Sequence, residues 1–516
     1  MLPGILIIAF PVCKAQQTAK PNILFCLADD ASFPHMGQNC RWINTPAFDR
    51  VSRQGIFFEN AYTPNAKCAP SRACILTGRN SWQLKEAANM FCYFPAEFKT
   101  YPEAFAENGY YVGSTGKGWA PGEPGMKDGK LRELAGKGWN SLKTTPPTTG
   151  ISTNDYVANF EEFYNNKPRG KPFCFWFGSH EPHRGYEYAS SLKAGKKTSN
   201  VDTVPPFLPD SETVRTDLLD YGYEIEYFDQ QVQRMLDFLE KNGDLYNTII
   251  IITADNGMPF PRAKTDDYEY SNHMPMAIMW KNGIKKPGRI VKDYVSFIDL
   301  AVTFFDVADI NWNKSGMQSS PGKSLYPVFK NPKLKEPFRD HVLIGKERHG
   351  VGRPDDLGYP IRGIIKDDWL YLINYRSDLW PAGNPQTGYP DVDGSPTKTE
   401  TLNCRHQTEK KYLWQLSFGK RPGEELYYLK DDQYCIHNMA ELPEILGIKA
   451  NLKHVMKTEL IKQSDPRMFG NGDIFQKYKY SDAHWRNAYQ RIVINKEDLV
   501  FPWINASDIE KDFIEE

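Results

Sequence analysis

The sequence predicts an α/β fold, in which a large, mostly parallel sheet is sandwiched by helices and a smaller α+β domain follows. Three continuous apolar runs support this prediction, at residues 22–28, 172–178 and 248–254. Strands that are buried on both faces of a parallel sheet have such runs instead of polar alternation. Helical patterns lie between the runs, and strand alternating with helix is typical of layered α/β domains.

The helical patterns are local and end at clear signals. Residues 102–108 predict a short helix that Gly109 closes, and residues 110–113 predict the strand after it. The longest pattern keeps one apolar face from Leu218 to Leu239, and Asn242-Gly243 ends it. We therefore expect helices on the faces of the sheet.

The character of the chain changes near residues 350–360. Residues 350–359 are loop-like, residues 360–375 alternate as a strand does, and residues 377–425 are rich in Pro, Gly, Asn and Thr. A strand at 424–429 and a helical stretch to about residue 464 follow. The chain therefore divides into a large domain at 18–359 and a smaller one at 360–516, with a small antiparallel sheet and a helix.

The first residues resemble a secretory signal peptide. Residues 1–10 are almost wholly apolar, and small or polar residues follow around Ala15. We predict a signal peptide at 1–17 and an exported protein, periplasmic or extracellular, or lysosomal in a eukaryote. The apolar run is too short to cross a bilayer and no later run is longer, so no membrane span is expected.

The composition is that of an ordinary globular protein. Lys and Arg number 63 and Asp and Glu 64, for a net charge of −1, so no nucleic-acid partner is expected. The nine cysteines include no Cys-x-x-Cys pair, which argues against a zinc site or a disulfide scaffold. A disulfide involving Cys404 and Cys435 stays open.

Polar side chains follow each of the three apolar runs. The first run ends in Asp29-Asp30, the second leads to His180 and His183, and the third ends in Asp255-Asn256. Ligands bind beyond the carboxyl ends of the strands in open α/β sheets, so these side chains predict one site. The oxygens of Asp29, Asp30, Asp255 and Asn256 suit Ca²⁺.

A reactive cysteine is the centre of the functional prediction. Cys68-Ala69-Pro70-Ser71-Arg72 could open a helix, and the helix dipole and Arg72 would then favour a thiolate. Taken alone, the segment is equally compatible with an inert, half-buried thiol at a helix start.

In context, this segment resembles the signature of the formylglycine-dependent (type I) sulfatases, Cys-x-Pro-Ser-Arg followed by Leu-Thr-Gly-Arg at 76–79. Further blocks occur in the family order, at 21–30, 44–50, 55–62, 115–117, 182–183, 255–257 and 425–427. The resemblance spans most of the chain and implies an alkaline-phosphatase-like fold, with a helix at 44–50 and a strand at 55–62 before the nucleophile.

The resemblance also implies the chemistry. A separate formylglycine-generating or sulfatase-maturing enzyme would oxidise Cys68 to formylglycine, whose hydrate has two hydroxyls. One hydroxyl attacks sulfur and the other then expels sulfate, so that one hard displacement is divided into two. The implied Ca²⁺ ligands are Asp29, Asp30, Cys68, Asp255 and Asn256.

Roles follow for the remaining site residues. Arg72 would orient the diol, Lys117 and Lys264 would stabilise charge on the sulfuryl oxygens, and His183 would protonate the leaving group. One departure is Trp119, which stands where family members usually have a His that handles the proton of the diol. The expected substrate contacts are His180, Trp119, Arg348 and His349.

The segments 178–184 and 255–261 resemble one branch, the sulfamidases, which remove the N-sulfate of glucosamine from heparan sulfate. Lys264 matches a basic residue of that branch. We therefore expect a sulfated glycan as substrate. Three alternatives stay open: an O-sulfatase on glycosaminoglycans or other sulfated sugars, a phosphonate or phosphate ester hydrolase of the same superfold, and an inactive glycan-binding relative.

Overall fold

The computed structural model describes residues 20–334, 337–511 and 513. Its main sheet has the strand order β12-β2-β11-β10-β1-β9-β4-β8. Among the described residues every pairing in this sheet is parallel, except those of β11 with β10 and β2. The mostly parallel sheet is thus confirmed. Its strands are β1 (Asn22–Ala28), β2 (Ile56–Tyr62), β4 (Tyr111–Gly116), β8 (Lys137–Gly138), β9 (Phe173–Gly178), β10 (Thr248–Ala254), β11 (His273–Met279) and β12 (Arg289–Ser296).

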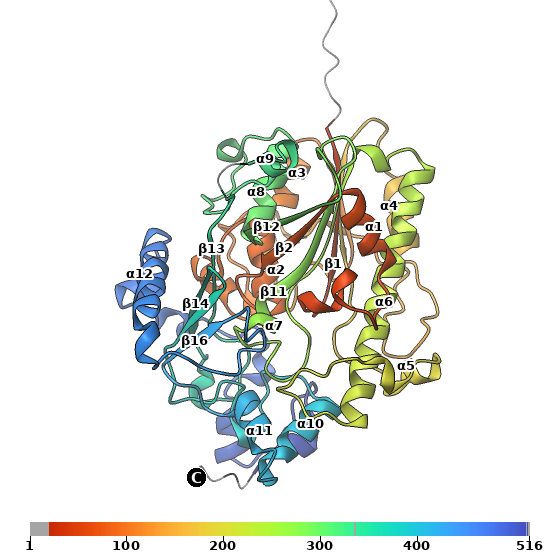
Figure 1. The fold of residues 1–516 in the computed structure, drawn as a ribbon. Helices are drawn as coiled ribbons and strands as arrows, with labels where there is room; N and C mark the ends of the chain where they lie inside the picture. Colours follow the sequence, from red (N-terminus) through yellow and green to blue (C-terminus); the bar gives the residue numbers. More distant parts are fainter. Residues whose placement is uncertain (1–19, 335–336, 512, 514–516) are drawn as a thin grey trace, which may run out of the picture.

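Helices cover both faces of this sheet (Figure 1). On one face lie α1 (Pro46–Gln54), α4 (Tyr156–Asn165) and α6 (Glu212–Lys241). On the other lie α2 (Cys68–Thr77), α3 (Tyr101–Glu107) and α8 (Ile298–Val307). Short helices in the connections are α5 (Ser190–Lys193), α7 (Glu269–Asn272) and α9 (Tyr326–Lys330).

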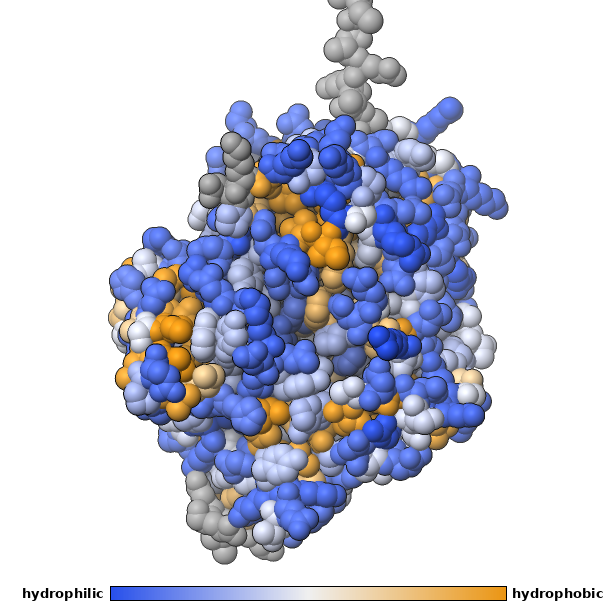
Figure 2. All heavy atoms as spheres, viewed as in Figure 1, coloured by the Kyte–Doolittle hydropathy of each residue, from blue (hydrophilic) through white to orange (hydrophobic). Residues whose placement is uncertain are grey.

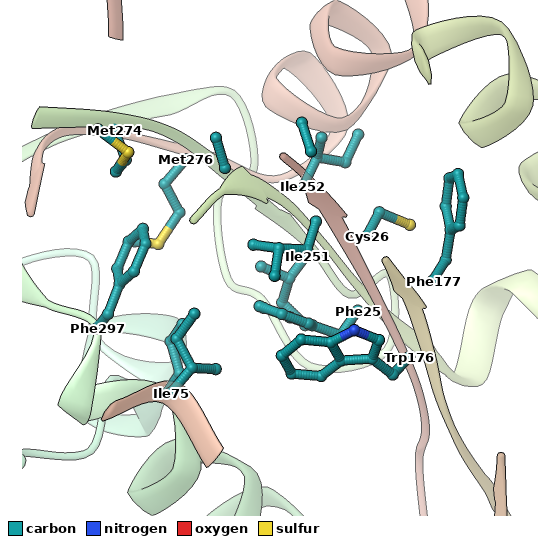
Figure 3. Close-up of a cluster of buried hydrophobic side chains, with 14 of the residues drawn as sticks. Phe25, Cys26, Ile75, Trp176, Phe177, Ile251, Ile252, Met274, Met276 and Phe297 are labelled. Atoms are coloured by element: carbon teal, nitrogen blue, oxygen red, sulfur yellow. The ribbon is translucent and has the colours of Figure 1, made fainter. Parts of the chain in front are cut away.

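The core lies between the central strands and these helices. Every residue of β1, β9 and β10 is buried, as their continuous apolar runs predict. Figure 3 shows Phe25 of β1 beside Trp176 of β9, and their ring centroids are 4.8 Å apart. Ile75 of α2 reaches the same cluster, so the core fixes α2, and with it Cys68, against the sheet.

The C-terminal part has its own antiparallel sheet, β13 (His341–Lys346), β14 (Ile361–Lys366), β15 (Trp369–Asn374) and β16 (Glu424–Tyr428), with α12 (Leu446–Lys462) packed against it. The expected strand at 360–375 is a hairpin. Its turn lies at Asp367 and Asp368, whose φ angles of 50° and 62° suit a tight two-residue turn. Since β13 precedes residue 360, the small sheet begins before the boundary that the sequence predicts.

The segment rich in Pro, Gly, Asn and Thr, residues 377–425, contains two helices. They are α10 (Pro396–Asn403) and α11 (Lys411–Phe418), and α13 (Ile474–Lys477) follows nearer the C-terminus. The remaining strands form two small pairs, β3 (Cys92–Tyr93) with β5 (Gly122–Glu123) and β6 (Met126–Lys127) with β7 (Lys130–Leu131).

Cys404 and Cys435 are both buried free thiols. The disulfide between them that the sequence left undecided is therefore not formed in this structure. The predicted signal peptide at 1–17 lies outside the described residues. In the described part of the chain, no helix is both long and apolar enough to cross a membrane. Figure 2 shows mainly hydrophilic residues on one face, with apolar residues gathered in a few patches, one of them over α12.

Candidate active site

The register of the parallel strands brings the predicted polar residues to one edge of the sheet. Ala28 at the end of β1 pairs with Ala254 at the end of β10, and Leu27 pairs with Gly178 at the end of β9. The residues that follow these strands, beginning with Asp29 and Asp255, therefore meet at the same level. The convergence that the sequence predicts is present in the structure.

Two glycines bring Lys117 into this group. Gly116, with φ 74°, pairs with Gly178 on the adjacent strands β4 and β9, and the Lys117 amide donates to the Gly178 carbonyl at 2.7 Å. A Cβ on Gly178 would lie 1.8 Å from the Lys117 carbonyl oxygen. Only glycine permits this close approach, which places the Lys117 ammonium against the Asp29 carboxylate.

Cys68 is the first residue of α2 and is fully buried. Its Sγ lies 3.3 Å from Asp29 Oδ1 and 3.8 Å from Asp30 Oδ1. Burial, and then the Asp29 carboxylate, raise the pKa of the thiol. The expectation of a thiolate is therefore wrong for the unmodified chain, because desolvation and the Asp29 carboxylate outweigh the nearby cations Lys117 and Lys264.

Arg72 lies one helical turn after Cys68 and is also fully buried. Its Nε donates to Asp255 Oδ2 at 2.8 Å, and its Nη1 donates to the carbonyls of Lys117 and Gly118 at 2.7 and 2.9 Å. The guanidinium thus ties α2 to the ends of β4 and β10. Its place is fixed by two other segments of the chain.

Ligand atoms of Asp29, Cys68 and Asp255 lie within 4.8 Å of one another. Burial, and then the charge of Asp29, raise the pKa of Asp255 to about 7, because an ionised carboxylate is unfavourable away from water and beside a second carboxylate. Asn256 Oδ1 is buried with no hydrogen-bond partner in the described structure. An orphan carbonyl oxygen beside crowded carboxylates is the donor set that a hard cation such as Ca²⁺ prefers.

Asp30 completes this group in a strained backbone conformation, with φ 78°. Its Oδ1 accepts from Asn256 Nδ2 at 2.7 Å and its Oδ2 from Lys264 Nζ at 2.7 Å. Lys264 also contacts Asp393 Oδ2 at 2.8 Å. Lys264 is therefore buried between two carboxylates.

Asp393 is a site residue that sequence reasoning missed. It lies in the irregular segment before α10, and no apolar run or family block marks it. Although burial opposes the shift, Lys264 and then Lys67 hold the pKa of Asp393 below its usual range, so it is ionised. The only available signal was the pair of carboxylates at Asp391 and Asp393 in a polar loop.

The two histidines follow β9. His183 Nδ1 lies 3.1 Å from the Arg184 carbonyl, which can only accept, so the proton of the neutral ring is on Nδ1. Nε2 then faces the site, 4.0 Å from Asp30 Oδ2. Burial, and then Lys264, lower the pKa of His183. His180 is exposed and lines the cavity.

A cavity of about 430 Å³ opens over these residues. Its walls come from both parts of the chain: Asp29, Lys67, Met90, Phe91, Lys117, Ala120, Pro121, Gly150, His180, His183, Arg184, Lys264, His349, Gly350, Pro390, Asp393, Tyr480 and Trp503. The volume suits one sugar unit with its substituents.

The structure does not bring two of the expected substrate contacts to this cavity. The Trp119 indole donates to the Ala69 carbonyl at 3.0 Å and packs edge-on against Phe94, so it braces the first turn of α2. Arg348 is buried and donates to the Tyr478 carbonyl at 2.7 Å. His349 does line the cavity, and its Nε2 lies 2.8 Å from Asn65 Oδ1.

This fold, with crowded carboxylates facing a basic cavity at the strand ends, defines a hydrolase of the alkaline-phosphatase-like class that acts on an anionic ester. The family model described as Sulfatase matches residues 21–310, more than half of the chain. The chain therefore belongs to the sulfatase family, and it is a sulfuric ester hydrolase.

Curated relatives agree with this assignment. The chain is 27% identical to the N-sulphoglucosamine sulphohydrolase of Homo sapiens, over 89% of this chain and 92% of that protein. It is 26% identical to an N-acetylglucosamine-6-O-sulfatase of Bacteroides thetaiotaomicron, over 62% of this chain and 72% of that protein.

Solved structures show the same fold. A protein in complex with its substrate, D-glucosamine-2-N,6-O-disulfate, matches with a TM-score of 0.58 at 18% identity, over 86% of this chain and 98% of that chain. A phosphonate monoester hydrolase from Silicibacter pomeroyi matches with a TM-score of 0.59 at 14% identity, over 86% and 96%. The fold alone therefore does not separate these two chemistries.

Proposed function

We propose that this sulfatase hydrolyses the N-sulfate of glucosamine, as in heparan sulfate, with formylglycine formed from Cys68 and with Ca²⁺ as cofactor. The observation that supports this most is the position of Cys68, which heads α2 with its Sγ against Asp29 and with Arg72 in the next turn. The human relative named for N-sulfoglucosamine supports the N-sulfate. Relatives named for 6-sulfates support O-sulfate hydrolysis as the second candidate.

The residues present fit a calcium ion. Asp29, Asp30, Asp255, Asn256 and the modified residue 68 would hold it, and the orphan Asn256 Oδ1 would gain a partner. A bound Ca²⁺ would supply positive charge to the sulfate oxygens and offset the crowded carboxylates. The chain's own cations, Lys117 and Lys264, then stabilise the charge that develops on the sulfuryl group.

Formylglycine at position 68 would supply a hydrated aldehyde, with one hydroxyl to attack sulfur and a second to release sulfate. Arg72, fixed by Asp255 and two backbone carbonyls, would orient that diol. Because Cys68 has no exposed surface, the maturing enzyme would have to act before this segment folds. Maturation is thus proposed to precede the folding of this segment.

His183 is the proposed proton donor to the leaving nitrogen or oxygen. Its Nε2 faces the site and is free of a backbone partner, since Nδ1 contacts the Arg184 carbonyl. In the free enzyme the ring is neutral, because burial and Lys264 lower its pKa. An anionic sulfate beside the ring favours the protonated form, so the proton would be taken up as substrate binds.

The decisive experiment is sulfate release by matured enzyme from glucosamine N-sulfate, compared with 6-O-, 2-O- and 3-O-sulfated sugars and with a phosphonate monoester. We expect sulfate and free amine from the N-sulfate and none with Cys68→Ala. Release only from an O-sulfate would discard the N-sulfate assignment. Turnover of the phosphonate alone would refute the proposed substrate class, and full activity of Cys68→Ala would refute the nucleophile.

A further inference from the structure

Four cationic side chains line the cavity, and three of them are ion-paired. Lys117 pairs with Asp29, Lys264 with Asp30 and Asp393, and Arg184 with Asp217. The fourth is Lys67, the residue before Cys68. Within the described part of the chain no carboxylate lies at ion-pair distance from it; its Nζ donates to the Asp391 carbonyl at 3.4 Å.

Lys67 is nonetheless almost wholly buried, with 6% of its surface exposed, and that surface belongs to the cavity. Burying an ammonium group is costly unless it is paired and hydrogen-bonded. One long bond to a backbone carbonyl and the attraction of the more distant Asp393 carboxylate offset only part of that cost. The Lys67 ammonium group can therefore still bind a ligand in the cavity, and an anionic group would compensate its charge.

The sulfate that is hydrolysed has cationic partners without Lys67. Arg72, Lys117 and Lys264 already surround the nucleophile with positive charge. Lys67 instead reaches the loop of Asp391, beside Pro390 on the cavity wall that the C-terminal part supplies. A substituent on another position of the same sugar, or on the next sugar, would meet Lys67 there.

Aromatic rings on the same wall could support that sugar. Phe91 and Tyr480 have ring centroids 4.9 Å apart, and Phe91 and Trp503 are stacked at 6.1 Å. Phe91 has φ 48°, a conformation that a bulky residue adopts only when its surroundings impose it. Strain of this kind is concentrated at functional sites, which fits a ring held toward a ligand.

We infer that Lys67 binds a second anionic substituent of the substrate, a sulfate or a carboxylate, so that the enzyme favours sugars with one more negative group than the one it removes. This inference rests on the proposed function, because it places the scissile sulfate at the Lys117 and Lys264 end of the cavity.

The test is calorimetric binding in a Cys68→Ala background, which prevents turnover. Three probes are used: glucosamine N-sulfate, glucosamine N,6-O-disulfate, and N-sulfated glucosamine linked to glucuronic acid. Lys67→Met should weaken the binding of one or both doubly charged probes about tenfold and that of the monosulfate less than twofold. The probe that loses affinity identifies the anion as sulfate or carboxylate. The matched control is Lys292→Met, which removes one charge from an exposed lysine outside this cavity.

Equal weakening of all three probes would overturn the inference, since Lys67 would then hold the scissile sulfate. No weakening, or no binding of any probe, would overturn it as well. If Lys67→Met does not fold, the parent must still bind a doubly charged probe about tenfold more tightly than the monosulfate. Absence of sulfate release by matured wild-type enzyme would refute the proposed function separately. The binding ratios would still show whether Lys67 binds a second anionic group.

Discussion

Replacing Arg72 with methionine perturbs the site most cleanly. The side chain is fully buried, pairs with Asp255 Oδ2 at 2.8 Å, lies 3.5 Å from Asp29 Oδ1, and donates to two backbone carbonyls. Methionine has a similar length, so the loss is mainly of charge and hydrogen bonds. Two carboxylates would then stay buried with less compensation.

Removing one partner of a buried ion pair costs about 3–5 kcal/mol. At about 2 °C per kcal/mol for a large domain, the melting temperature of calcium-free protein should fall by roughly 6–10 °C. Differential scanning calorimetry measures this shift. The fall should be smaller at pH 5 than at pH 8, because loss of Arg72 raises the pKa of Asp255 further and protonation then removes part of the buried charge.

Arg376→Met is the matched control. Its partner, Asp378, lies 2.8 Å away, and the two side chains are 38% and 62% exposed. A surface pair of this kind contributes between about 0 and 1 kcal/mol, so the control should shift the melting temperature by less than about 2 °C. Equal shifts in the two variants would show that the Arg72 pair does not stabilise the fold as argued.

Two further predictions concern the metal and the strand ends. Burial and Asp29 raise the pKa of Asp255 from 3.8 to about 7, so the folded state retains a proton that the unfolded state loses, and metal-free stability should fall as pH rises through that window. Calcium should therefore raise the melting temperature more at pH 8 than at pH 5, and equal shifts would contradict the calcium assignment. Gly178→Ala should abolish sulfate release, because its Cβ would lie 1.8 Å from the Lys117 carbonyl. Gly447→Ala on α12, with no atom near its Cβ, should keep full activity; a fully active Gly178→Ala would refute the close approach.

The sequence predicts the central strands well because burial on both faces leaves a continuous apolar run. The same signal fails at residues 360–375, where β14 and β15 are two buried strands of a hairpin and only Asp367 and Asp368 mark the turn. The apolar pattern also fails to predict α10, because the residues of this helix are largely polar. Packing against α6 stabilises α10, and no apolar periodicity in its own sequence marks it.

The candidate site divides in the same way. Asp29, Asp255 and Lys117 follow strand ends, so the order of strands and the family blocks predict them. Asp393 could not be predicted, because a long connection brings it to Lys264. The charge state of Cys68 was missed for a different reason: the sequence shows its neighbours along the helix, whereas its pKa depends on complete burial and on a carboxylate 39 residues away.

The central claim is that the nucleophile is made from Cys68. Mass spectrometry of the peptide that contains residue 68, from an enzyme preparation with measured sulfatase activity, tests it most directly. We expect an aldehyde in place of the thiol, at a fraction that rises in proportion to specific activity and is near zero in a host without a maturing enzyme. Full activity in protein whose residue 68 is entirely an unmodified thiol would contradict it.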